Sequence, residues 1–427
     1  MLLALVALVA FLPLQARSAQ DSSHFCLSRA LLHGHLTVDD CTGLSLDHSR
    51  YGGHLYSNKA PGVPVLAIPA VLATRLPLPV SQHPPRDWRL DAVRLFVSGL
   101  PFLLAVFLVG RIAEGLRPGT GGLALVAFGL GTLMAPFAAV GFDHTAAAAA
   151  GLAAFILAWN RRPLAAGALA GCAVLCEYEA AVVVVALAVY VVVKGGRHAA
   201  FRYLLGAAPG VALLGLYGWA AFGAPWRNPL SYSDNVYRAK HAVGFLGVQL
   251  PNAHATWLVF FGQKGLLVIS PVLAAAAFGL VCLWREGRRA EVGVCTAVFA
   301  VLAFAECGYF DPYGGDSPGP RYLVAALPFL AVGLGPAFAH ARRRSLALAI
   351  PSVVACVLLE LTWTRDPDYT STFWGDVVHL AGRGGGELPG KVADTMLVKL
   401  GAGSAVGATL VLSAATAAFL VAAVRRR

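Results

Sequence analysis

The sequence predicts an all-α polytopic membrane protein with about 12 transmembrane helices. Of its 427 residues, 58% are hydrophobic and only 13% are charged, whereas soluble domains are about one-quarter charged. Long apolar runs alternate with short polar segments, and helices satisfy the backbone of such runs in lipid. The basic residues behind the net charge of +11 lie in short clusters between these runs. That distribution is typical of membrane topology rather than of a basic face, so we expect no nucleic-acid partner.

The apolar runs indicate one membrane domain over residues 1–427, with a first helix at 1–17, a first outer loop at 18–91, and further helices and loops at 92–427. The first run resembles a signal peptide, because a sequence similar to a cleavage site, ARSA, follows it. No basic residues precede the run, as they do in signal peptides, so we expect an uncleaved first helix. The expected spans are 1–17, 92–110, 121–141, 144–159, 163–177, 179–193, 204–222, 264–284, 291–307, 321–339, 345–363 and 402–424.

One further apolar run, residues 61–80, decides the topology. If it lies along the outer surface, six very short segments that hold 16 of the 33 Lys and Arg residues all face the cytoplasm. If it spans, the basic segments after it face outward, against the positive-inside rule. We therefore expect a surface-lying helix at 61–80 and residues 18–91 outside the cytoplasm. The protein is then a multi-pass plasma-membrane protein whose site faces outward.

Two of the eight cysteines lie in the first polar loop. Cys26 and Cys41 can form a disulfide if that loop is outside the cytoplasm, but the sequence leaves the pairing open. The other six lie in or beside apolar segments, where small packing residues are expected. No spacing typical of a zinc site is present.

Carboxylates gather on the expected outer side. Asp21 follows the first helix, Asp40 lies in LTVDDC, and Asp47 opens the run LDHSRYGGHLYSNKAPG. Asp143 lies in a minimal turn between two apolar helices. A carboxylate can accept a proton from a hydroxyl or hold a divalent cation against phosphate. Alone, each acid could also be a solvated loop residue or a helix cap. The group suggests a site that uses Mg²⁺ or Mn²⁺, with Asp21 and Asp143 as candidate ligands.

Aromatic and basic residues accompany these acids. Lys59 precedes a Pro-Gly turn, where it can neutralise phosphate or extend to lipid headgroups. His54 and Tyr56 can line a sugar pocket or anchor the membrane interface. His144 extends the Asp143 turn, and Glu177 stands at the next outer turn, where a short polar segment can also serve only to reverse the chain.

A second polar island ends in a cation. Arg321 closes GYFDPYGGDSPGPR at the start of an apolar run. Guanidinium binds phosphate in a bidentate manner, although an arginine at headgroup level is an ordinary feature of membrane proteins.

At these residues the chain resembles the GT-C membrane glycosyltransferases, in the branch of protein mannosyltransferases and aminoarabinose transferases. Asp21 stands where the family has an acid after its first helix, and residues 56–61 resemble its Tyr-x-x-Lys-x-Pro stretch. Asp143 stands where the family has a second acid at an outer turn. Arg321 stands where the family has a phosphate-binding cation late in the chain. SNKAPG and the later GPRYL are most similar to actinobacterial members.

The chain departs from this pattern in two ways. The family often has Asp-Glu after the first helix, whereas this chain has Asp21-Ser22, so Asp40 and Asp47 remain alternatives for the base. We expect no large C-terminal outer domain, so that loops 223–263 and 365–401 recognise the acceptor.

The resemblance implies an inverting transfer of a sugar from a polyprenyl-phosphate donor to a glycan, lipid or protein acceptor at the outer face. One carboxylate among Asp21, Asp40 and Asp47 is expected to be the base. Asp143 is expected to be its partner, with Tyr56, Lys59, His54, His144 and Arg321 binding substrate. The alternatives are a transporter or lipid flippase, which favours broken helices and mid-membrane polar groups, and a non-catalytic assembly partner.

Overall fold

The computed structural model describes residues 1–11, 18–41, 47–76, 88–235, 237–315 and 317–362. The predicted span 402–424 and the predicted loop 365–401 lie outside these residues. The chain forms two compact units. The first comprises Met1–Gln15, Phe102–Ala139 and Pro251–Arg427, and the second comprises Ala16–Pro101 and Val140–Leu250, each within the described residues.

The first unit is helical. Its α6 packs against α1 and α17, while α13 packs against α16 and α14 against η5. Its elements are α1 (Leu2–Phe11), α5 (Leu100–Leu116, from Phe102), α6 (Gly121–Gly131), α11 (Ala253–Phe261), α12 (Leu266–Ile269), α13 (Val272–Arg285), α14 (Arg289–Gly308), η5 (Arg321–Ala326), α15 (Leu327–Ala331), α16 (Leu334–His340) and α17 (Arg342–Thr362).

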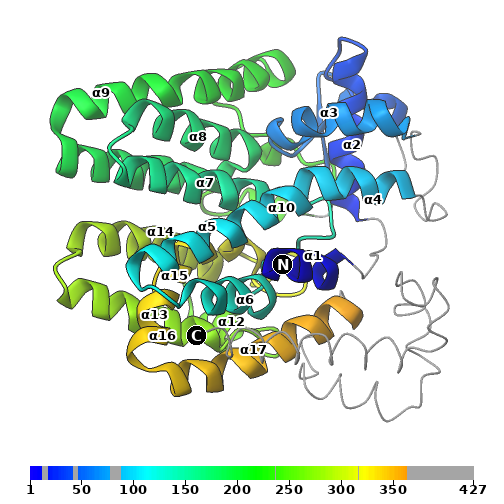
Figure 1. Ribbon diagram of the computed structural model, residues 1–427. Helices are drawn as coiled ribbons and strands as arrows, with labels where there is room; N and C mark the ends of the chain where they lie inside the picture. The colour runs from blue at the N-terminus through cyan, green and yellow to red at the C-terminus, as the bar shows by residue number, and fades with distance from the viewer. Residues whose placement is uncertain (12–17, 42–46, 77–87, 236, 316, 363–427) are drawn as a thin grey trace, which may run out of the picture. The chain divides into compact units, whose positions relative to one another are not determined.

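The second unit joins three long helices to a polar segment that follows α1 in the chain. In Figure 1, α7, α8 and α9 lie side by side, and α2 lies beside α3. Its elements are α2 (Ala19–Leu32), η1 (Asp39–Cys41), β1 (His48–Tyr51), β2 (His54–Ser57), α3 (Gly62–Thr74), α4 (Trp88–Arg94), η2 (Leu95–Gly99), α7 (His144–Trp159), α8 (Pro163–Cys176), η3 (Tyr178–Ala180), α9 (Ala181–Phe222), η4 (Pro229–Tyr232) and α10 (Arg238–His241).

The predicted spans 179–193 and 204–222 are the two arms of α9. The helix is broken at Gly196, whose φ of 72° and ψ of −172° are not helical. The Tyr203 hydroxyl donates a hydrogen bond to the Val184 carbonyl across the arms, at 2.9 Å. Gly167 and Gly171 of α8 face the backbone of Tyr203 and Ala207, which leaves no room for a Cβ. These small residues allow close helix packing.

The predicted first outer loop contains a β-hairpin, which an all-α prediction missed. Strand β1 pairs antiparallel with β2 in the register Tyr51↔His54. Gly52 and Gly53 form the two-residue turn, with φ values of 58° and 87°. A tight hairpin turn of this kind needs positive φ at both positions, which glycine adopts without a steric cost.

The helix expected at residues 61–80 is present as α3. Its 13 residues correspond to about 20 Å, which is shorter than the hydrocarbon core of about 30 Å. Gly62 lies against the backbone of Leu175 in α8, and Val65, Leu66 and Leu72 are exposed. This length agrees with a surface-lying helix. Residues 77–80 lie outside the described residues, and the topology stays a prediction.

The predicted number of spans is not confirmed. Within the described residues, three helical segments are long and apolar enough to cross a membrane, namely Trp88–Leu116, Tyr178–Phe222 and Arg289–Gly308. Two bent pairs raise the number to five if each counts as one span: Ala253–Ile269 with Val272–Arg285, and Arg321–Ala331 with Leu334–His340. The described fold is mostly helical, as the apolar runs predict.

Cys26 and Cys41 form a disulfide that ties α2 to η1, with their Cα atoms 6.0 Å apart. Both cysteines are buried in a small apolar cluster with Leu27, Leu55 and Phe222. The pairing that the sequence left open is therefore present in the structure.

Replacing both cysteines by alanine is expected to lower the free energy of unfolding by about 3 kcal/mol, because a loop of about 15 residues is no longer closed in the unfolded chain. Thermal unfolding in detergent measures the change. Replacing Cys282 and Cys295, which are free, is the control. Equal unfolding temperatures for the Cys26/Cys41 variant and the native protein would exclude a stabilising bridge.

Candidate active site

Asp21, the acid after the first helix, is buried, and both of its carboxylate oxygens accept hydrogen bonds. Ser18 caps α2, and its hydroxyl and the Asp21 carboxylate form a reciprocal capping box. Asp21 has no exposed surface. Its Oδ1 accepts from the Gly141 amide at 2.9 Å and from Arg94 Nε at 3.1 Å. Its Oδ2 accepts from Arg94 Nη2 at 2.5 Å.

Arg94 was missed in the sequence. It is buried at the end of α4 and holds Asp21 with two hydrogen bonds. Burial opposes ionisation of Asp21, but the Arg94 charge and the hydrogen bonds outweigh it and hold its pKa well below the usual range. A proton acceptor needs a free oxygen and a pKa near the working pH. This geometry favours a positioning role for Asp21 over the predicted base.

Asp143 lies in a buried acid–imidazole cluster. It occupies the N-cap position of α7, yet its side chain makes no capping hydrogen bond. His144 Nδ1 lies 3.4 Å from Asp143 Oδ1 and 2.5 Å from Glu177 Oε1. Glu177 ends α8, so the start of one helix and the end of the next bring the three side chains together. We name Asp143, His144 and Glu177 the triad.

Two polar side chains of α2 approach the triad, and the sequence analysis missed both. Gln20 Nε2 donates to Asp143 Oδ1 at 2.6 Å, and His24 Nε2 lies 3.9 Å from Asp143 Oδ2. Gln20 and His24 are both buried. Their spacing of four residues puts them on one face of α2. This spacing is the signal that could have found them, once residues 19–32 are taken as a helix.

His24 is kept neutral mainly by burial. Burial lowers its pKa to about 4; nearby Asp143, Asp21 and Asp47 oppose the shift, while Lys59 adds to it. In the unfolded chain His24 is protonated below about pH 6.5, whereas in the folded chain it is protonated only below about pH 4. The contribution of neutral His24 to stability is therefore complete above pH 6.5 and is lost as the pH falls from 6.5 to 4.

His24→Asn is expected to flatten the fall in unfolding temperature between pH 6.5 and 4, because asparagine does not titrate there. Differential scanning fluorimetry in detergent across this range measures it. His54→Asn is the control, because His54 is exposed. An unchanged slope in the His24 variant would rule out this titration.

Lys59 and Asp47 form an ion pair in the chain that packs against Ser23 of α2. Lys59 Nζ lies 3.3 Å from Asp47 Oδ1, and both side chains keep partial exposure. Ser23 of α2 donates to the Asp47 carbonyl at 2.6 Å and lies 2.7 Å from the Ser57 hydroxyl. These bonds fix the chain on either side of the ion pair. Lys59 and Asp47 both act electrostatically on the His24 imidazole, as Asp143 of the triad does.

The remaining candidates of the first loop lie elsewhere on the second unit. Tyr56 packs on Phe222, with ring centroids 5.3 Å apart, so its ring belongs to the apolar cluster around the disulfide. His54 is exposed and pairs with Asp39 at 2.8 Å. Asp40 is exposed on η1. Asp47 is the one of the three predicted bases that is partly exposed beside a cation.

Arg321 belongs to the first unit, and its position relative to Lys59 is not defined. It starts η5, and its guanidinium donates to the Tyr322 hydroxyl at 2.9 Å. The same island contains Tyr313, whose hydroxyl donates to the Leu258 carbonyl at 3.2 Å. The Lys264 amide donates to the Tyr313 hydroxyl at 3.4 Å, and Lys264 is buried. The backbone of Lys264, a cation that the sequence analysis did not consider, therefore lies beside this island.

The triad fits a divalent cation. One ligand atom from each of its three residues lies within 4.8 Å of the others. Two carboxylates and an imidazole suit Mn²⁺, Zn²⁺ or Fe²⁺ better than Ca²⁺, which takes oxygen ligands only. Of the two predicted ligands, Asp143 is in this cluster, whereas the oxygens of Asp21 bind Arg94, Ser18 and Gly141.

Comparison of the fold finds membrane transferases of low sequence identity. The Archaeoglobus fulgidus oligosaccharyltransferase in complex with Zn and sulfate matches with a TM-score of 0.52 and 13% identity, over 89% of this chain and 57% of that one. AglB from the same organism, in complex with an inhibitory peptide and a dolichol-phosphate, matches with a TM-score of 0.50 and 12% identity. The match covers 91% of this chain and 58% of that one.

A bacterial structure matches over almost the whole chain. ArnT from Cupriavidus metallidurans, bound to undecaprenyl phosphate, has a TM-score of 0.50 and 12% identity, over 99% of this chain and 75% of that one. The chain thus spans less than three-fifths of the length of the archaeal enzymes. No protein-family model and no curated protein matches the sequence. The chain has the fold of the GT-C membrane glycosyltransferases.

Proposed function

We propose that the protein is an inverting membrane glycosyltransferase that moves a sugar from a polyprenyl-phosphate donor to an acceptor at the outer face of the plasma membrane. The observation that carries the proposal is the buried triad in the same unit as the Lys59–Asp47 ion pair, on a fold shared with transferases. AglB was solved with a dolichol-phosphate and ArnT with undecaprenyl phosphate, and a lipid-linked donor explains why so much of an enzyme is apolar.

The reaction joins an acceptor oxygen to the sugar. A carboxylate takes the acceptor hydroxyl proton while the oxygen attacks C1 of the sugar. The bond between C1 and the phosphate oxygen breaks, and polyprenyl phosphate leaves with the electron pair. Attack opposite the leaving group inverts C1.

Asp47 is the base in this proposal, because its carboxylate lies 3.3 Å from Lys59 and, unlike that of Asp21, keeps partial exposure that an acceptor hydroxyl needs to approach it. Asp21 positions α2 through Arg94 and Gly141. Gln20 and His24 then orient Asp143. A divalent cation held by the triad would neutralise phosphate oxygens of the donor.

Lys59 of the second unit and Arg321 of the first unit are each assigned a role in binding the donor phosphate in this proposal. Lys59→Ala and Arg321→Ala are each expected to weaken binding of undecaprenyl phosphate roughly 10-fold or more, because a charge-assisted hydrogen bond contributes about 1.5–3 kcal/mol. Quenching of intrinsic fluorescence in detergent measures binding. Arg50→Ala is the matched control, since Arg50 is exposed and pairs with Asp234. Unchanged affinity in both test variants would remove the phosphate role.

A transporter or lipid flippase is the second candidate. The pairs Ala253–Ile269 with Val272–Arg285, bent by 87°, and Arg321–Ala331 with Leu334–His340, bent by 53°, resemble the broken helices of transporters. Deletion of the gene separates the two functions. Loss of a transferase leaves an acceptor without its sugar and raises the level of one lipid-linked sugar. Loss of a flippase leaves that sugar on the cytoplasmic leaflet, where membrane-impermeant reagents do not reach it in intact cells.

A further inference from the structure

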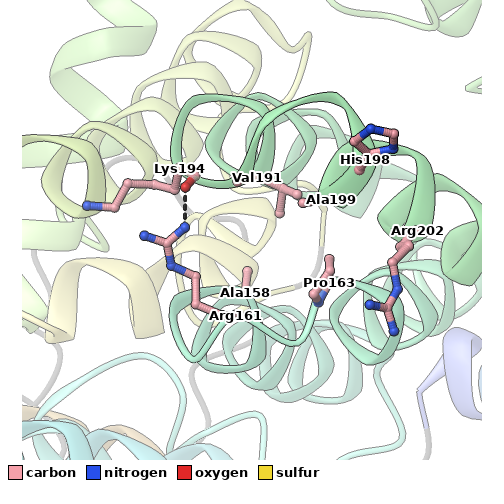
Figure 2. Close-up of a pocket in the computed structure, with 9 residues that line it drawn as sticks. Ala158, Arg161, Pro163, Val191, Lys194, His198, Ala199 and Arg202 are labelled. Atoms are coloured by element: carbon pink, nitrogen blue, oxygen red, sulfur yellow. Dashed lines mark hydrogen bonds between the residues drawn. The ribbon is translucent and has the colours of Figure 1, made fainter.

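A basic cavity lies at the end of α7 and α8 away from the triad. It has a volume of about 420 Å³ and opens between the α7–α8 turn and the break in α9 (Figure 2). Arg161 comes from the turn, while Lys194, His198 and Arg202 come from the two sides of the break. All belong to the second unit.

The cavity wall is held together by a specific contact. The Arg161 guanidinium donates to the Lys194 carbonyl, as the dashed line in Figure 2 shows. Arg161 itself adopts φ of 59°, in the left-handed region that non-glycine residues seldom occupy. This contact joins the α7–α8 turn to the end of the first arm of α9. The cavity is therefore a built feature of the two turns rather than a chance grouping of surface chains.

The charge of the cavity is of one sign. The sequence from His144 to Cys176, and from Ala181 to Phe222, contains no Asp or Glu. The helices that form the cavity thus supply three fixed cations and a histidine but no carboxylate. Such a concave site attracts an anion.

The surroundings of the cavity are apolar. Leu164, Val193, Phe201 and Leu204 lie near its basic residues in sequence and are exposed by 43%, 68%, 67% and 55%. The 16 residues of α7 correspond to about 24 Å between the triad and this cavity, close to the thickness of a hydrocarbon core. A basic site beside exposed apolar helix faces, at one membrane boundary, suits an anionic headgroup whose acyl chains lie along those faces.

We propose that this cavity binds the phosphate headgroup of an anionic phospholipid, on the membrane side opposite the triad. Arg202, with Lys194 at the opposite end of the cavity (Figure 2), supplies the charge that attracts the phosphate, and Arg161 keeps the walls together. Membrane proteins bind anionic headgroups in basic pockets between helices on the cytoplasmic side. The site does not depend on the glycosyl-transfer proposal, because it uses none of those residues.

The test compares two double variants with the same loss of charge. Lys194→Gln/Arg202→Gln changes the cavity, whereas Arg162→Gln/Arg197→Gln changes exposed residues in the same two turns that do not line it. Each protein is placed in phosphatidylcholine nanodiscs containing a minority of phosphatidylglycerol. Native mass spectrometry then measures the retained lipid. Arg202→Gln alone serves if the cavity double variant fails to fold.

The cavity double variant is expected to retain phosphatidylglycerol roughly 30-fold less tightly, because each basic residue near a headgroup contributes about 1 kcal/mol. The control is expected to bind as the native protein does. Equal losses in both variants would overturn the proposal, since the charges would then act through the general surface potential. Displacement of the lipid by inorganic phosphate would overturn the lipid assignment and identify a site for a free anion.

Discussion

Asp47→Asn is expected to lower sugar transfer by roughly 10²–10⁴-fold while leaving binding of the lipid donor intact. The amide keeps the shape of the carboxylate but cannot accept the acceptor proton, and general-base catalysis typically contributes this much. Turnover with saturating donor, measured at matched protein level, gives the effect.

Asp40→Asn is the matched control, because Asp40 is an exposed acid of the same segment and should keep nearly full activity. Asp143→Asn should lose activity that excess Mn²⁺ partly restores, since it removes one oxygen ligand of the triad. Asp21→Asn should lose stability more than turnover. Near-native turnover in all four single variants would refute the site and make the transporter the leading interpretation.

Arg94→Met is expected to lower the free energy of unfolding by about 3–5 kcal/mol, because it leaves the Asp21 carboxylate buried without its cation. Asp21 and Arg94 are each at most 1% exposed, so water cannot replace the lost partner. Adding Asp21→Asn to Arg94→Met should recover part of the loss, since the buried charge is then removed. Thermal unfolding of both variants in detergent measures this. A double variant no more stable than Arg94→Met would contradict a buried charge as the cause.

The sequence predicted the helices of the fold better than the contacts between them. Apolar runs mark helices because lipid and protein interiors both exclude unpaired backbone. They do not mark where two helices lie side by side: the sequence predicts the two arms of α9 as the spans 179–193 and 204–222, but not the contact of Tyr203 with Val184 between them. The hairpin at His48–Ser57 was missed because its strands are short and polar, although Gly52-Gly53 is a recognised turn signal.

The candidate site was predicted in part. A polar turn between two apolar helices was enough to single out Asp143 and His144. The sequence does not single out Gln20 and His24, because the segment after α1 has no apolar periodicity that marks it as a helix, and their four-residue spacing has meaning only on a helix. Arg94 carries a signal in the sequence, because an arginine within the predicted span 92–110 is costly in a membrane and needs an acidic partner; Asp21 is that partner.

The central claim is that the protein transfers a sugar from a polyprenyl-phosphate donor. The most direct test uses purified protein in proteoliposomes that contain lipid-linked sugars extracted from membranes of a strain lacking the gene, with envelope glycans from that strain as acceptors. Mass spectrometry follows both lipids and glycans. The account predicts that one lipid-linked sugar is consumed, that polyprenyl phosphate appears in equal amount, and that Asp47→Asn prevents both. A donor that remains chemically unchanged with the active native protein, or that only moves between leaflets, would contradict it.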